Sequence, residues 1–229
     1  GADTIVMVGS GPPCRLGLYD LVQKVILEDM GLHYRWLTIP PRLTWQAIWK
    51  NHEETKELRK ELSAKNILLF PYGLWMGWKK MIACEALEQL AMKVRPKEIK
   101  KGETQKRFKE VLSWVDEAKT LKTLEEAFEK GKTFLQGMEQ DRSRIPFKVA
   151  MVGELYTVMD PQINRGVEQK LGELGAEVTR SSWFSTHIRR SLRWDKNEQG
   201  SERIRFLEAS KAYLGYDVGA ECNISIGEA

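Results

Sequence analysis

Residues 147–181 read FKVAMVGELYTVMDPQINRGVEQKLGELGAEVTRS, and this stretch has the pattern of a β-loop-α-β unit. The run from Phe147 to Val152 is short and apolar and is followed by Gly153, which is typical of a strand that ends at a turn. A helical pattern then ends at Gly175, and residues 176–181 predict a second strand. Because strands joined through a helix run parallel, we expect a parallel pair with a right-handed crossover.

The N-terminal residues repeat this plan. Thr4–Val8 is an apolar, β-branched run before Gly9, an amphipathic helix is predicted up to Gly31, and residues 34–39 predict the second strand. The two glycines that flank the loop and helix have the same spacing in both units. We therefore expect an α/β fold with two Rossmann-like lobes, each containing a parallel sheet.

The residues between these units are nearly all helical in pattern. Phe108, Val111 and Val115 lie at helical spacing, and Thr123 with Glu126 has the pattern of a capping box. Two strands are few for a doubly wound sheet, so we interpret the chain as an internal fragment of a longer protein. The expected parts are a first lobe at 1–42, a helical insertion at 43–142 and a second lobe, incomplete at its C-terminus, at 143–229.

The composition is that of an ordinary globular protein, with 42% apolar and 30% charged residues. The longest apolar stretch, Asn66–Trp78, is interrupted by Pro71 and is too short to cross a bilayer, so we expect no membrane partner. The net charge of +4 is mild, and the basic stretch Lys93–Lys109 is poor in aromatic residues, so we expect no nucleic-acid partner. With no signal-peptide pattern and three widely spaced cysteines, a cytoplasmic, reducing compartment is expected.

The connection after the first strand, GSGPPCRLGLY at residues 9–19, carries the most distinctive chemistry. It begins like a dinucleotide-binding fingerprint, but Cys14 replaces the third glycine, and Pro12 and Pro13 lack the backbone N–H groups that a pyrophosphate would use. A thiol at a helix N-terminus beside Arg15 is stabilised as the thiolate. Cys14 is therefore a candidate nucleophile or metal ligand, the alternative being a small buried residue in a strand-to-helix turn.

The corresponding connection of the second unit carries Gly153, Glu154 and Asn164. Ligands of parallel sheets bind beyond the carboxyl ends of the strands, so these residues are candidates for cofactor binding. Glu154 and Asn164 are equally suited to capping a helix, and both interpretations stay open.

Three further features have two interpretations each. The basic cluster of His187, Arg189, Arg190 and Arg193 suits an anionic ligand such as a CoA phosphate, or a solvated helix face. Cys84 lies in an apolar helical stripe and is expected in the core, whereas Cys222 follows a polar loop and is expected to be structural. No two cysteines have the spacing of a zinc site.

The loop around Cys14 also carries a resemblance. GADTIVMVGSGPPCRLGLYDLVQKVIL (residues 1–27) resembles the Gly-Ala-Asp-Thr-Ile…Gly-Pro-Cys-Arg-x-Gly-x-Tyr segment of the 2-hydroxyacyl-CoA dehydratase superfamily. The likeness is to its branch of acyl-CoA dehydratase activase-related proteins and CoA-substrate-specific enzyme activases. Residues 147–178 are similar to that family's Val-Gly-Glu-x-Tyr…Asp-Pro…Asn segment, and SIGEA at residues 225–229 resembles its Ser-Ile-Gly segment.

The resemblance implies an oxygen-sensitive 4Fe-4S protein of anaerobic metabolism. In this family an ATP-dependent activase delivers a low-potential electron to a cluster, and that electron permits radical removal of water from a 2-hydroxyacyl-CoA. Cys14 would then be a cluster ligand, and the partners would be an activase or dehydratase subunit and a CoA thioester.

One cysteine cannot hold a cubane cluster. The iron–sulfur cluster is therefore expected in the full-length protein, a lyase of the dehydratase type, and this chain alone is expected to be inactive. Two alternatives stay open: a non-enzymatic domain that binds CoA or docks an activase without a cluster of its own, and a thiol enzyme that uses Cys14 as its nucleophile.

Overall fold

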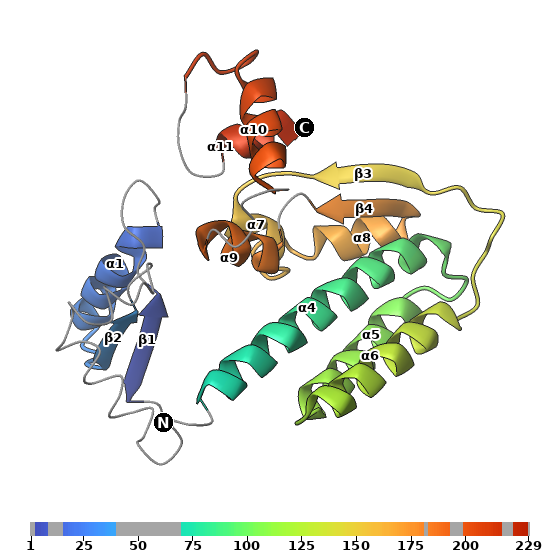
Figure 1. Cartoon of the computed structure of the whole chain (residues 1–229), viewed down its shortest axis with the longest axis horizontal. Helices are drawn as coiled ribbons and strands as arrows, with labels where there is room; N and C mark the ends of the chain where they lie inside the picture. Colours follow the sequence, from blue (N-terminus) through green and yellow to red (C-terminus); the bar gives the residue numbers. More distant parts are fainter. Residues whose placement is uncertain are drawn as a thin grey trace. The chain divides into compact units, whose positions relative to one another are not determined.

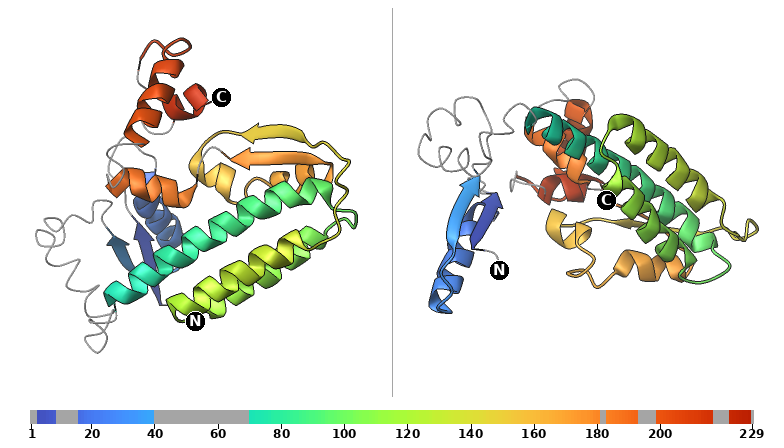
Figure 2. Two further views of the ribbon diagram at one scale, coloured as in Figure 1. Left: turned by 45° about the vertical axis from the view of Figure 1, so that its right-hand side comes forward. Right: turned by 90° about the horizontal axis from the view of Figure 1, so that it is seen from below.

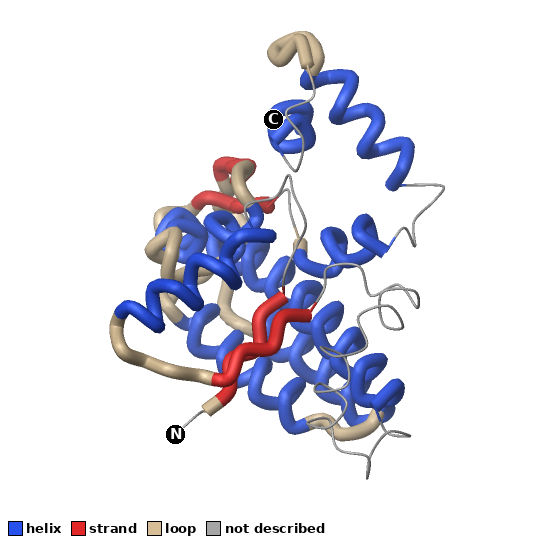
Figure 3. Tube along the Cα trace, turned by 90° about the vertical axis from the view of Figure 1, so that its left-hand side faces the viewer, coloured by secondary structure: helices blue, strands red, loops and turns tan. Residues whose placement is uncertain are grey.

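The computed structural model describes residues 3–8, 16–39, 70–180, 183–192, 199–216 and 222–228 (Figure 1). The chain divides into two compact units, Gly1–Pro71 and Tyr72–Ala229. In the described ranges the strands form two sheets of two strands each, and both pairs are parallel (Figure 3). The expected α/β class is confirmed at this level, with helices as the dominant element.

The described part of the first unit is a β-α-β crossover made of β1 (Thr4–Val8), α1 (Leu16–Asp29) and β2 (Arg35–Ile39). The strands pair in parallel, as the sequence predicts, with Thr4 opposite Arg35 and Val8 opposite Ile39. Gly31 has a φ of 74° and its N–H donates to the Glu28 carbonyl at 2.9 Å, so a left-handed glycine ends the helix.

The second unit begins with three helices that lie side by side (Figure 1, Figure 2). They are α4 (Phe70–Val94), α5 (Glu103–Glu117) and α6 (Leu121–Gln136), with the short 3-10 helix η2 (Arg95–Lys97) after α4. Leu87, Val111 and Leu135 come from the three helices in turn and are almost fully buried, so they form the centre of the core. The predicted apolar stripe of α5 is confirmed, because Phe108, Val111 and Val115 all belong to this core.

The capping box lies one turn earlier than the sequence pattern predicts. Thr120, not Thr123, is the N-cap of α6. Its Oγ1 accepts from the Thr123 N–H at 3.2 Å, and the Thr123 Oγ1 accepts from the Thr120 N–H at 3.0 Å. Thr123 therefore fills the third position of the capping box, which the sequence pattern assigned to Glu126, because a threonine hydroxyl can accept the hydrogen bond from the N-cap N–H.

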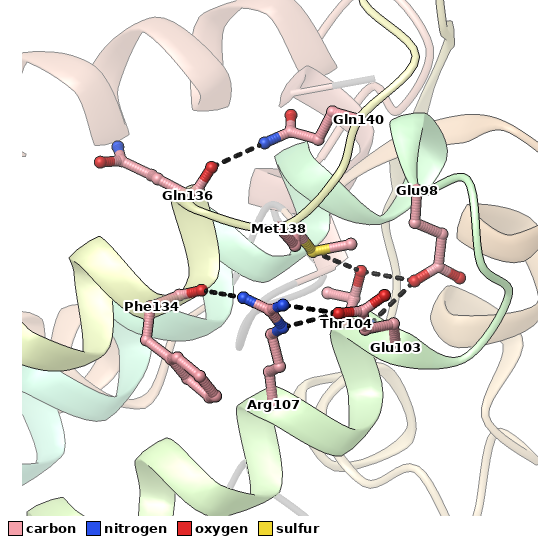
Figure 4. Close-up of polar contacts among 8 residues, drawn as sticks. All are labelled: Glu98, Glu103, Thr104, Arg107, Phe134, Gln136, Met138 and Gln140. Carbon is pink, nitrogen blue, oxygen red and sulfur yellow. Dashed lines mark hydrogen bonds and ion pairs between the residues drawn. The ribbon is translucent and has the colours of Figure 1, made fainter.

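The start of α5 is fixed by a buried carboxylate (Figure 4). Glu98 accepts from the Gly102 N–H at 2.8 Å, the Thr104 N–H at 2.9 Å and the Thr104 hydroxyl at 2.6 Å. Arg107 of α5 donates to the Phe134 carbonyl of α6 at 2.8 Å and ion-pairs with Glu103. These bonds satisfy helix-end groups and tie α5 to α6.

The rest of the second unit contains its sheet and the helices around it. Its elements are β3 (Phe147–Met151), α7 (Leu155–Met159), α8 (Val167–Glu173), β4 (Ala176–Arg180), α9 (Phe184–Leu192), α10 (Gln199–Ser210) and α11 (Cys222–Glu228). β3 pairs with β4 from Phe147 opposite Ala176 to Met151 opposite Arg180, which confirms the predicted parallel pair. Short α7 occupies part of what the sequence predicts as loop.

Ala176, Val178 and Arg180 of β4 are buried, while the alternate residues Glu177 and Thr179 are more exposed. One face of β4 is therefore covered, and α8 and η2 pack against this strand, whereas no residue of β3 is buried.

Among the described residues no helix combines the length and the apolar character needed to cross a membrane. Cys14, Arg193 and residues 43–69 of the expected insertion lie outside the described ranges.

Candidate functional site

The connection that follows β3 is the part of the predicted site that the structure describes. Gly153 has a φ of 150°, which favours glycine, and a Cβ at this position would lie 3.2 Å from Val158 Cγ2. Glu154 comes next and is the N-cap of α7. It accepts from the Thr157 N–H at 2.9 Å and from the Thr157 hydroxyl at 3.0 Å. The turn from strand to helix is thus closed by Glu154 itself.

The same hydrogen bonds determine the charge of Glu154. Partial burial by itself would raise the pKa of its carboxyl, but the backbone N–H groups of Thr157 and Tyr156 and the Thr157 hydroxyl all donate to it. Together they hold the pKa of Glu154 below its ordinary value. Glu154 is therefore a carboxylate at neutral pH, placed beside a helix N-terminus.

Asn164 connects the end of α7 to the start of α8. Its Nδ2 donates to the Val158 carbonyl at 3.1 Å, and its Oδ1 accepts from the N–H groups of Gly166 at 3.0 Å and Val167 at 3.4 Å. Both ends of the amide are engaged, so Asn164 closes the turn that leads into α8, although the N-cap of that helix is Gly166. Its role toward a ligand stays a prediction.

Helix α11 contacts this connection from a distant part of the sequence. The Ser225 hydroxyl donates to the Gly153 carbonyl at 3.4 Å. The helix is held on α10 through buried Asn223, whose Nδ2 donates to the Ser210 hydroxyl of α10 at 3.4 Å and to the Tyr216 carbonyl at 3.2 Å. A Cβ at Gly227 would overlap the Phe206 carbonyl, so this close approach requires glycine.

This contact brings together two segments that the resemblance singled out separately. Ser225 belongs to the SIGEA segment, and Gly153 belongs to the Val-Gly-Glu segment. No local pattern in the sequence signals the pairing, because the partners are distant in the chain. The candidate site therefore consists of Gly153, Glu154, Asn164 and Ser225.

Three of the four residues of the basic cluster lie in the described part of the chain. His187, Arg189 and Arg190 lie within α9, and the Arg189 guanidinium lies 5.8 Å from the centre of the Trp78 ring of α4. The N-terminus of α9 is also tied to α4, because Glu85 accepts from the Ser185 N–H at 2.8 Å and from the Ser185 hydroxyl. Arg189 is thus packed on an aromatic ring rather than simply solvated.

The two described thiols differ in their surroundings. Cys84 is half-buried and packs against the helical core, as expected. Its burial raises the pKa of its thiol, and the negative charge of nearby Glu88 raises it further. Cys222, expected to be structural, is exposed at the start of α11. Within the described ranges no three His, Cys, Asp or Glu side chains gather in a way that could hold a metal ion.

No family model matches this chain, and no curated protein or solved structure matches it either.

Proposed function

We propose that this chain is part of an iron–sulfur protein related to the 2-hydroxyacyl-CoA dehydratases or their activases, which supports ATP-driven low-potential electron transfer and radical dehydration of a 2-hydroxyacyl-CoA. In this proposal the two parallel β-α-β units are Rossmann-like lobes, and Cys14 is a cluster ligand. The partners are an ATP-dependent activase or dehydratase subunit and a CoA thioester.

The observation that supports the proposal is the position of both motifs relative to the strands. β1 ends at Val8 and α1 begins at Leu16, so Cys14 belongs to the connection that leaves the carboxyl end of β1. Gly153 and Glu154 leave β3 in the same way. Parallel sheets bind their ligands at these connections, which is the arrangement that the proposal needs.

The described residues do not fit a complete cluster site. A cubane needs several thiolates, whereas Cys84 is half-buried in the helical core with a raised pKa. Cys222 is exposed and has no second candidate ligand grouped with it in the described ranges. The remaining ligands must therefore come from outside these residues, and we expect the chain alone to lack dehydratase activity.

Metal analysis tests this proposal. The chain is purified without oxygen, alone and within a longer natural protein that contains it, and iron, acid-labile sulfide and visible absorption are measured. The longer protein is expected to bind iron and sulfide, and Cys14→Ser is expected to reduce both. Cys84→Ser is the matched control and should leave the iron content unchanged. Equal iron content in wild type and Cys14→Ser would contradict Cys14 as a ligand.

A second candidate is a non-enzymatic domain that binds CoA or docks an activase. Helix α9 favours it, since Arg189 is held against Trp78 of α4 in a position where a guanidinium can meet an anion. Calorimetry with CoA at millimolar concentration tests this function. Heat that is lost in Arg189→Gln would support it, and no heat above background would count against it.

A further inference from the structure

Arg180, the last residue of β4, is a buried cation held between two carboxylates. Its side chain is 2% exposed. Its Nη2 lies 2.5 Å from Glu88 Oε1 of α4, and its Nε lies 2.8 Å from Glu168 Oε1 of α8. The guanidinium also lies over the Trp183 ring, 4.3 Å from its centre. Helix α4 therefore meets α8 and β4, which lie far from it in the chain, at one charge.

Among the described residues, two guanidinium groups and three carboxylates contribute charge around this point, and only Arg180 is within ion-pair distance of both Glu88 and Glu168. Arg95 of η2 is the second buried cation, and its Nη2 donates to Gln105 of α5 at 2.9 Å. Three carboxylates lie near these cations, namely Glu88 of α4, Glu168 of α8 and Glu98. Glu98 already accepts hydrogen bonds at the start of α5. On α8 itself, Glu173 accepts from Gln169 at 2.7 Å. Facing Glu168 there are thus two attractive guanidinium groups and one carboxylate, Glu88, that repels it.

The geometry of the ion pairs limits their strength. The pairs satisfy the distance for an ion pair, yet Glu168 Oε1 and the Arg180 Nε and Nη2 make no well-aligned hydrogen bond in the described part of the chain. Poorly aligned pairs offset less of the cost of burying charge. Burial raises the pKa of Glu168 to about 7, Glu88 adds to this rise, and Arg180 and Arg95 act against it.

We infer that Glu88, Arg180 and Glu168 form a proton-operated clasp that holds the β3–α8–β4 sheet unit against α4. A proton on the carboxylate pair closes the clasp, since one guanidinium then faces a single negative charge. Release of that proton leaves Glu88 and Glu168 both charged on the same guanidinium, where they repel each other, and loosens α8 and β4 from α4.

The direction of the pH effect follows from the proton balance. The folded state keeps the proton on Glu168 up to about pH 7, whereas the unfolded chain releases it near the ordinary pKa of a glutamate, about 4.3. The stabilisation by this group is therefore fully present below the unfolded pKa and is lost as pH rises through about 7. Over this window the ratio of folded to unfolded chain falls by up to about tenfold per pH unit.

Denaturant unfolding of the whole chain, followed by circular dichroism from about pH 5 to about pH 8, tests the clasp. Wild type is expected to lose stability with rising pH, and Glu168→Gln should remove this slope. Glu177→Gln is the matched control, because Glu177 is the β4 carboxylate three residues before Arg180 on the opposite face of the strand, and it should keep the slope. A slope that is as steep in Glu168→Gln as in wild type would overturn the inference.

Two further measurements test the clasp even if the Glu168→Gln variant does not fold. Glu88→Gln removes the repelling carboxylate and should move the loss of stability to lower pH; an unchanged profile counts against the clasp. Hydrogen exchange, corrected for its intrinsic pH dependence, should show lower protection of β4 and α8 at the upper end of the pH range, with α5 and α6 unchanged. Equal loss in all four elements would contradict a local clasp.

Discussion

Gly131 tests how closely the three helices of the core approach one another. It is buried in α6, and a Cβ at this position would lie 2.5 Å from Val111 Cγ1 and 3.4 Å from Leu87 Cδ2. We predict that Gly131→Ala destabilises the protein, although alanine is the better helix former.

The magnitude follows from two opposing effects. Replacing glycine by alanine within a helix stabilises it by about 1 kcal/mol. Overpacking a closed core costs about 1–3 kcal/mol. Val111 cannot move aside cheaply, because it is fully buried and a β-branched side chain in a helix has one preferred rotamer. We therefore expect a net loss of up to about 2 kcal/mol in the free energy of unfolding.

Urea unfolding at constant pH measures this change, and two variants control it. Gly77→Ala is the matched control, since Gly77 is exposed in α4 and an added methyl group there would meet no atom of the described residues within 4 Å, so this variant should stabilise the protein. In a Val111→Ala background, Gly131→Ala should become neutral or stabilising. If Gly131→Ala stabilised the wild-type chain as much as Gly77→Ala does, the close approach of α5 and α6 would be refuted.

Three further predictions concern single groups. Glu98→Ala should lower the free energy of unfolding by about 1–3 kcal/mol, because the Gly102 and Thr104 donors lose their buried partner; a neutral result would contradict the cap. Asn164→Ala should cost about 1 kcal/mol, and Asn164→Asp should recover part of it by keeping the bonds from Gly166 and Val167. A maleimide probe followed by mass spectrometry should modify exposed Cys222 before Cys84, whose pKa is raised by burial; the reverse order would contradict their placement.

The parallel pairs were predictable because their signals are local. Apolar runs, left-handed glycines and a helical pattern between them mark each unit. β3 ends one residue before its predicted limit, and Ser181, the predicted end of β4, lies outside the described ranges. Gly31 and Gly175 both have positive φ, in agreement with their predicted role as helix stops.

The α6 cap shows why a local pattern can mislead. The Thr123–Glu126 pair has the correct spacing, but Thr120 offers the same chemistry one turn earlier, and the helix begins there. Local patterns could not predict the contacts that assemble the candidate site and the clasp. Ser225 on Gly153, Glu85 on Ser185 and Glu88 on Arg180 each join residues that are far apart in the chain.

Iron and acid-labile sulfide in the anaerobically purified longer protein, compared between wild type and Cys14→Ser, test the central proposal most directly. We predict a cluster in the longer protein, less iron and sulfide in the variant, and no complete cluster on this chain alone. Iron and sulfide that stay unchanged in Cys14→Ser, or their absence from the longer protein, would contradict the proposal.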